Sequence, residues 1–143
     1  GLGVKNLYQS GFDVFRTGPT DNRIFGRGGF TKRSEDMHKF KVPQLYNLKS
    51  LGFYFHGASK RDLREVVNYF NEGVAENPEV PASQVSPLLR PLNLTTKEIA
   101  DLTEFLKNGL YDPKIERYKP ASVMSGMCFP NNDYRSKLDM GCH

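Results

Sequence analysis

Tryptophan is absent from the 143-residue sequence, cysteine occurs only twice, and apolar runs are short. A membrane-crossing helix needs roughly 20 consecutive apolar residues, so the sequence predicts no membrane span. A strong charge imbalance is missing as well, because the net charge is +4 and basic residues are spread along the whole chain. Nucleic-acid-binding proteins usually gather their basic residues on one face. We therefore expect no nucleic-acid partner, and the small positive excess suits docking to an acidic protein better.

One short run, RGGF at residues 27–30, is similar to RNA-binding arginine-glycine tracts. It occurs once and mixed charges follow it, so a turn with close backbone packing is the favoured interpretation. Alternating strand patterns and fixed-period repeats are also missing. Nine Pro and thirteen Gly place much of the chain in turns. The sequence predicts a mainly α fold with extensive loops.

Two segments have clear helix signals. The first begins with a capping-box pattern at Ser59 and Asp62 and ends at Gly73. The second begins at Thr95, with Glu98 three residues later, and ends near Gly109. Their apolar faces are expected to form one core, made of Leu63, Val66, Val67, Ile99, Leu102 and Leu106, with Phe70 on the same stripe.

A weaker helix signal lies at residues 43–51, where Pro43 fits a first helical position and Leu45, Leu48 and Leu51 are spaced three apart. The sequence thus divides into a loop region at 1–40, a helical core at 41–110 and a tail at 111–143. Because the chain begins with Gly1 and no leader pattern precedes it, we expect a signal peptide to be absent or already removed.

Cys128 and Cys142 both lie in the tail. Their spacing fits one small disulfide loop of about fifteen residues, whose closure can stabilise a domain by ~3 kcal/mol. Two free thiols in a reducing compartment are the alternative. A metal site with His143 is a third, although it lacks a close ligand pair.

Four blocks of sequence carry a family resemblance. They are FGRGGFT (25–31), FKVPQLYN (40–47), GFYFHG followed by LREVVNYFN (52–57 and 63–71), and LTTKEIADL followed by FL (94–102 and 105–106). In order and spacing they resemble the di-haem cytochrome c peroxidases, over about residues 25–110. The tail, with CFPNND at 128–133, is similar to that of some peroxidase-like proteins.

The resemblance implies the C-terminal part of a cytochrome c-like haem domain in an exported, periplasmic protein. Members of that family attach haem c through a CxxCH motif, in which the histidine ligates the iron. This sequence contains no such motif, and Cys142-His143 has no first cysteine at the required offset. We therefore expect haem c to be attached upstream of Gly1, by another segment or domain of the same protein.

Site residues follow from the same resemblance. The family's second axial ligand, Met or Tyr, lies fourteen residues beyond the histidine that corresponds to His56, and that position is Phe70, which has no ligand atom. Tyr69 would point about 100° away around a helix. Three possibilities remain open: a five-coordinate iron, ligation by Tyr69 through a local irregularity, and a degenerate site.

Other residues have less specific roles. His56 is interpreted as a neutral, hydrogen-bonded histidine at a domain interface in preference to an iron ligand. Arg27 is a candidate partner for a haem propionate, or a surface arginine without a role. Calcium between domains is implied through the backbone carbonyls of Leu51 and Phe53.

The function expected for the complete protein is reduction of hydrogen peroxide, with electrons from a small donor protein relayed between two haems. The family's acid and base residues belong to its other domain, so no catalytic residue is identified here, and this chain alone is expected to be inactive. A haem-free partner module that retains the fold is one alternative. Oxidation of an organic or protein substrate through high-valent haem is another.

Overall fold

The computed structural model describes residues 1–11, 16 and 18–113. Gly1–Tyr111 form one compact unit, and of a second unit, Asp112–His143, residues Asp112 and Pro113 are described. Two isolated β-bridges and no β-strand occur in the described residues, which confirms a mainly α class for them. The elements, in which η marks 3-10 turns except for the π-helical η6, are η1 (Leu7–Gln9), η2 (Asn22–Phe25), α1 (Arg27–Thr31), η3 (Ser34–Asp36), η4 (Leu48–Ser50), α2 (Leu63–Glu72), η5 (Ala82–Gln84), α3 (Thr96–Glu104) and η6 (Phe105–Gly109).

Helix α2 has its N-cap three residues later than predicted, at Asp62 instead of Ser59. Asp62 is the N-cap, and its carboxylate accepts a hydrogen bond from the Glu65 amide at 2.9 Å. The Ser59 hydroxyl instead donates to Glu76 Oε1 at 2.6 Å. The predicted end at Gly73 is confirmed, since this glycine adopts the left-handed conformation (φ 64°) that closes a helix.

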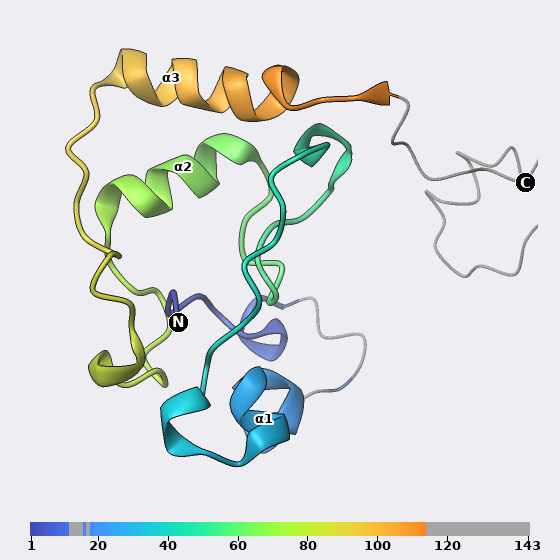
Figure 1. Cartoon of the computed structure of the whole chain (residues 1–143), viewed down its shortest axis with the longest axis vertical. Helices are drawn as coiled ribbons and strands as arrows, with labels where there is room; N and C mark the ends of the chain where they lie inside the picture. Colours follow the sequence, from blue (N-terminus) through green and yellow to red (C-terminus); the bar gives the residue numbers. More distant parts are fainter. Residues whose placement is uncertain (12–15, 17, 114–143) are drawn as a thin grey trace, which may run out of the picture. The chain divides into compact units, whose positions relative to one another are not determined.

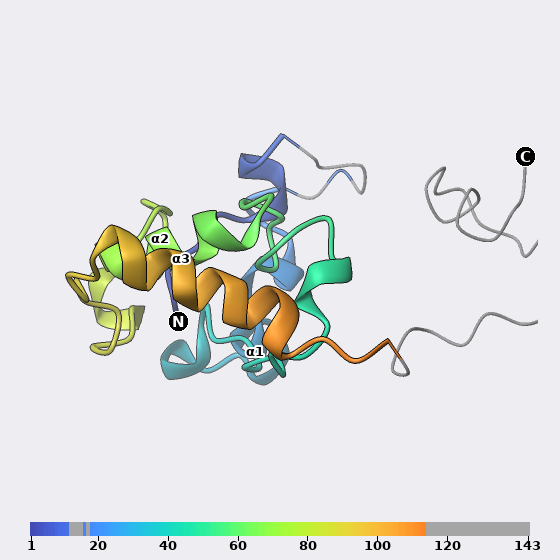
Figure 2. The same ribbon diagram turned by 90° about the horizontal axis from the view of Figure 1, so that it is seen from above.

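Helix α3 begins as predicted. Thr95 is the N-cap and forms a capping box with Glu98. The helix continues into η6, so the helical segment ends at Gly109 as expected. Figures 1 and 2 show α3 beside α2, and the amide of Leu94 ties the connecting loop to α2 by donating to Asn71 Oδ1 at 2.7 Å.

The predicted helix at residues 43–51 is wrong. The turn η4 is its sole helical part, and the preceding residues are irregular. Asn47 explains the break, because it adopts a left-handed conformation (φ 54°) and its amide donates to the Leu110 carbonyl at 3.0 Å instead of joining a helix. Leu45 and Leu51 are about half exposed as a result.

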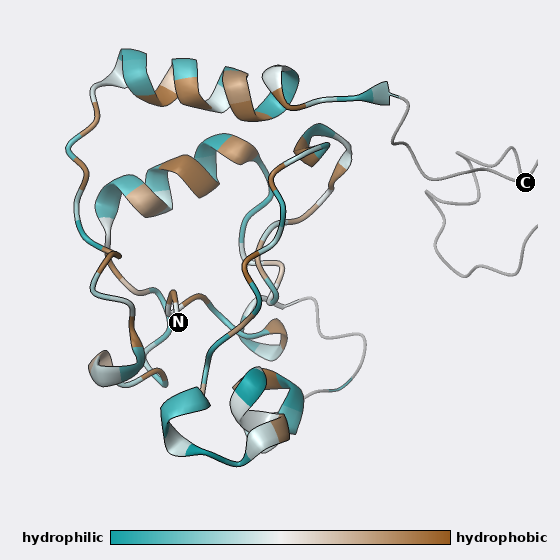
Figure 3. Ribbon diagram, in the orientation of Figure 1, coloured by the Kyte–Doolittle hydropathy of each residue, from teal (hydrophilic) through white to brown (hydrophobic). Residues whose placement is uncertain are grey.

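Helix α2 buries Leu63, Val67 and Tyr69, and Tyr69 reaches the N-terminal segment, which passes beneath this helix in Figure 1. The other buried apolar residues are Val4 in the N-terminal segment, Val80, and Ile24 in η2. The predicted core between the two helices is therefore partly wrong. Helix α3 has no buried residue and Leu102 is 39% exposed, because α3 packs on α2 along one side. Figure 3 shows hydrophobic residues along both helices.

None of the described helices has the length and apolar character needed to cross a lipid bilayer.

Candidate functional site

His56 lies in a strained turn at residues 55–58. The Ala58 amide donates to the Phe55 carbonyl at 3.2 Å, and both of these residues have positive φ, at 53° and 66°. Such conformations cost ~1–3 kcal/mol for residues with a side chain, and they are frequent at functional sites. Gly57 lets the turn close on the N-terminal segment, since a Cβ there would lie 1.9 Å from the Lys5 carbonyl oxygen.

The His56 imidazole is held on two sides. It stacks on Phe40 with ring centroids 3.8 Å apart and an angle of 14° between the planes. Its Nε2 lies 3.1 Å from Asn6 Oδ1, and although the residue as a whole is exposed, this contact is partly buried. Burial lowers the pKa of His56 to about 4, and His38 lowers it further while Glu76 opposes the shift. The ring is therefore neutral at pH 7.

Asn6 belongs to a polar network that fixes the N-terminal segment. Its backbone amide donates to Gln9 Oε1 at 2.8 Å, and Gln9 Nε2 donates to Asn77 Oδ1 at 3.1 Å. Asn77 Nδ2 in turn donates to the Val4 carbonyl. Asn6 is 1% exposed, and its Nδ2 forms no hydrogen bond of ordinary geometry with the described residues, although the side chain interacts with the Tyr8 hydroxyl.

Tyr69 points from α2 toward the N-terminal segment. It is 4% exposed, and its hydroxyl donates to the Leu2 carbonyl at 2.5 Å. Burial, followed by the charge of Glu76, raises the pKa of this phenol to about 12. Its ring meets those of Phe55 and Phe70 edge to face, at 5.3 and 5.9 Å. The two residues singled out on α2 thus belong to one aromatic cluster, in which the Tyr69 oxygen is already engaged.

The polar centre next to this cluster was not predicted from the sequence. Glu76 accepts hydrogen bonds from Lys60 Nζ at 2.5 Å, Ser59 Oγ at 2.6 Å and the Lys5 amide at 3.1 Å. Burial alone would raise the pKa of Glu76, but these bonds outweigh it and the pKa is lowered. No sequence motif marks Glu76, because its partners come from two segments, at Lys5 and at Ser59-Lys60, that are distant from it in the sequence.

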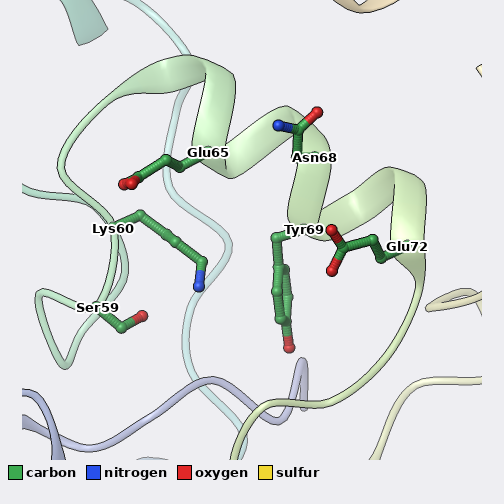
Figure 4. A pocket seen from close by; sticks show the side chains of 6 residues that line it. All are labelled: Ser59, Lys60, Glu65, Asn68, Tyr69 and Glu72. Carbon is green, nitrogen blue, oxygen red and sulfur yellow. The ribbon is translucent and has the colours of Figure 1, made fainter. Parts of the chain in front are cut away.

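An open pocket of about 260 Å³ borders this centre. Figure 4 shows the Lys60 ammonium beside the Tyr69 ring, and Lys60 Nζ lies 5.3 Å from the centroid of that ring. The lining residues are Ser59, Lys60, Glu65, Asn68, Tyr69 and Glu72. Lys60 forms an ion pair with Glu76, and both side chains are less than one fifth exposed.

Arg27 lies away from these groups. Its Nε pairs with Asp36 Oδ2 at 3.2 Å, and its side chain is 67% exposed. Asp36 is buried and also accepts a hydrogen bond from Thr31 Oγ1 at 2.9 Å. Arg27 therefore already has a carboxylate partner, and the structure does not bring it together with Tyr69.

Leu51 and Phe53 are both about half exposed. The Leu51 carbonyl accepts a hydrogen bond from the Tyr54 hydroxyl at 3.4 Å. Over the described ranges, no group of three or more His, Cys, Asp or Glu side chains is placed to hold a metal ion. Calcium at these carbonyls stays a prediction.

Cys128 and Cys142 lie outside the described residues, so their pairing stays a prediction too.

Comparison with known proteins gives partial, low-identity matches. The chain is 35% identical over 77 residues to the cytochrome-c peroxidase IdrP1 of Denitromonas iodatirespirans, which covers 54% of this chain and 19% of that protein. It is 31% identical over 104 residues to IdrP2 of the same organism, covering 73% of this chain and 25% of that protein. IdrP1 of Pseudomonas sp. (strain SCT) is 31% identical over 86 residues, covering 60% of this chain and 21% of that protein.

These matches relate the chain to cytochrome c peroxidases. The chain spans about a fifth to a quarter of the length of these relatives. No family model matches the sequence, and no solved structure matches it significantly.

Proposed function

We propose that this chain is part of a periplasmic c-type haem oxidoreductase of the peroxidase type. The complete protein would reduce hydrogen peroxide to two waters with two protons and two electrons. A small donor protein would supply the electrons, which pass between two haems. The observation that carries the proposal is the similarity to proteins named cytochrome-c peroxidase, which extends over up to 104 residues and includes the GFYFHG and LREVVNYFN blocks.

Haem c in this proposal is attached by a segment outside the chain, because the sequence contains no CxxCH. When bound, haem supplies the redox chemistry. The described residues fit such a group as an apolar and aromatic wall rather than as ligands: Phe55 and Phe70 offer ring surface, and the Tyr69 hydroxyl is bonded to Leu2. A cytochrome c-like haem domain would then be completed by the segment that attaches the haem.

Exposed apolar side chains support a partner within the same protein. On the helical segment of α3 and η6, Leu102 is 39% exposed and Phe105 is 53% exposed. Large apolar side chains at the surface, when several lie near each other, mark interaction sites. We infer that the upstream haem-bearing part covers the side of α3 that α2 leaves open. Calcium at the carbonyls of Leu51 and Phe53 would lie at the same interface.

A haem-free partner module is the second candidate. It is favoured by one observation: Phe70 stands where the family places a ligand, and the neighbouring Tyr69 oxygen donates to a backbone carbonyl. In that case the fold would serve as a binding surface without a redox group.

Production with a c-type haem maturation system decides between the two. The 143-residue chain is compared with the longer protein encoded by its gene, by intact mass, by a Soret absorbance band and by peroxide turnover with a reduced donor. We expect all three signals in the longer protein and none in the 143-residue chain. A covalent haem on the 143-residue chain contradicts upstream attachment. A longer protein without a Soret band leaves the haem-free module.

A further inference from the structure

The Asn6–His56 pair has a feature that packing alone does not explain. Asn6 is almost completely buried, yet its Nδ2 forms no hydrogen bond of ordinary geometry with the described residues, and a further polar neighbour of the side chain is the Tyr8 hydroxyl. An unpaired buried N–H is unfavourable, and the two left-handed residues on either side of His56 and Gly57 add strain. The unpaired N–H and the backbone strain both occur next to the contact between Asn6 Oδ1 and the His56 imidazole.

Hydrogen-bond chemistry then limits the state of the ring. A carboxamide oxygen can only accept, so the atom that faces it must carry a hydrogen. With Oδ1 at 3.1 Å, Nε2 is the protonated nitrogen of the neutral imidazole, and Nδ1 carries the lone pair. No hydrogen bond to Nδ1 is formed by any residue that the structure describes.

One further contact orients the ring. The imidazole stacks on Phe40, with ring centroids 3.8 Å apart and an angle of 14° between the planes. The network through Gln9 and Asn77 holds the Asn6 backbone in place. Asn6 is therefore a rigid acceptor, and its contact with His56 does not depend on a flexible surface side chain.

We propose that Asn6 is a positioning residue that selects the Nε2–H tautomer of His56 and leaves Nδ1 as an acceptor for a hydrogen-bond donor of the haem-bearing part. The identity of that part rests on the proposed function. Of the residues that the resemblance singles out on α2 and in the preceding turn, His56 alone then offers a free lone pair, because the Tyr69 oxygen is engaged and Phe70 has none.

The test is long-range ¹H–¹⁵N correlation spectroscopy on the haem-free 143-residue chain at pH 7, which identifies the protonated ring nitrogen. We expect His56 as the Nε2–H tautomer, with an exchange-protected ring proton close to Asn6. Asn6→Leu removes the acceptor, so this protected proton signal should be lost. Asn6→Asp keeps an acceptor of the same shape and should restore it. His38, whose ring does not contact Asn6, is the internal control in every spectrum.

Two outcomes overturn the proposal. One is an Nδ1–H tautomer in the parent chain, which would mean that Asn6 donates through Nδ2. The other is an unchanged protected proton in Asn6→Leu. If that variant does not fold, the parent chain and Asn6→Asp still decide, because loss of the signal in Asn6→Asp also contradicts the role. Haem content of the longer protein is measured separately, so failure of the proposed function is distinguishable.

Discussion

Replacing Leu63 and Leu102 one at a time by alanine compares the two helices with the same chemical change. The sequence assigns both leucines to one core. In the structure Leu63 is 5% exposed at the start of α2, whereas Leu102 on α3 is 39% exposed. Leu63→Ala should therefore lower the free energy of unfolding more than Leu102→Ala does.

The expected sizes follow from burial. Truncating a buried leucine to alanine removes the transfer free energy and leaves a cavity, at a cost of ~2–5 kcal/mol, which we expect for Leu63. Leu102 has lost roughly three fifths of its exposure, so about 1–2 kcal/mol of transfer free energy is involved. Solvent can fill the space at its open side, so no cavity cost is added. The two variants should differ by at least ~1 kcal/mol.

Urea denaturation followed by circular dichroism measures both free energies. With a slope of ~1–3 kcal/mol/M, the difference corresponds to roughly half a molar or more in the midpoint. Each variant is measured at two protein concentrations, because self-association would bury Leu102 and hide its exposure. Equal losses at both concentrations would refute the assignment of Leu63, rather than Leu102, to the core.

Four further predictions concern single groups. Gly57→Ala should destabilise the chain strongly, since its Cβ would lie 1.9 Å from the Lys5 carbonyl oxygen. Gly52→Ala is the matched control in the same urea assay, because no atom lies within 4 Å of a Cβ there. Equal urea midpoints for the two variants would contradict the close approach at Gly57. Tyr69→Phe should cost ~1–3 kcal/mol because the Leu2 carbonyl loses its donor, and absorbance titration should show one tyrosine fewer near pH 12. The pKa of His56 in the folded chain is about 4, below its ordinary value of 6.5, so between these pH values the unfolded chain binds more protons than the folded chain. The stability that depends on neutral His56 is complete above about pH 6.5 and falls as the pH drops toward 4. His56→Gln should flatten that part of a plot of stability against pH. Cys128 and Cys142 should be resistant to alkylation until a reductant is added. An intact protein mass that shows two alkylated thiols without reductant would rule out the disulfide.

Local signals in the sequence determined the helices. The Thr95 and Glu98 pair and the stop at Gly73 act within one turn of chain, so they work in the same way whatever packs around them. The class of protein was accessible for a related reason, because the resemblance rests on blocks of adjacent residues. At the start of α2, where the sequence indicates a capping box of Ser59 and Asp62, Asp62 is the N-cap, and the partner of Ser59 lies seventeen residues away at Glu76, which the sequence could not reveal.

The candidate site depended on contacts between distant segments. Asn6 meets His56 across fifty residues, Tyr69 meets Leu2 across 67, and the Lys5 amide meets Glu76 across 71. None of these pairs has a periodic or motif signal, because each is made only when the N-terminal segment packs beneath α2. The sequence by itself determined which residues have the chemistry to act, while the tertiary structure decided which of their atoms are already bonded and which remain free. That decision rests on chain packing, since a hydrogen bond between residues far apart forms only where the fold brings donor and acceptor within about 3 Å.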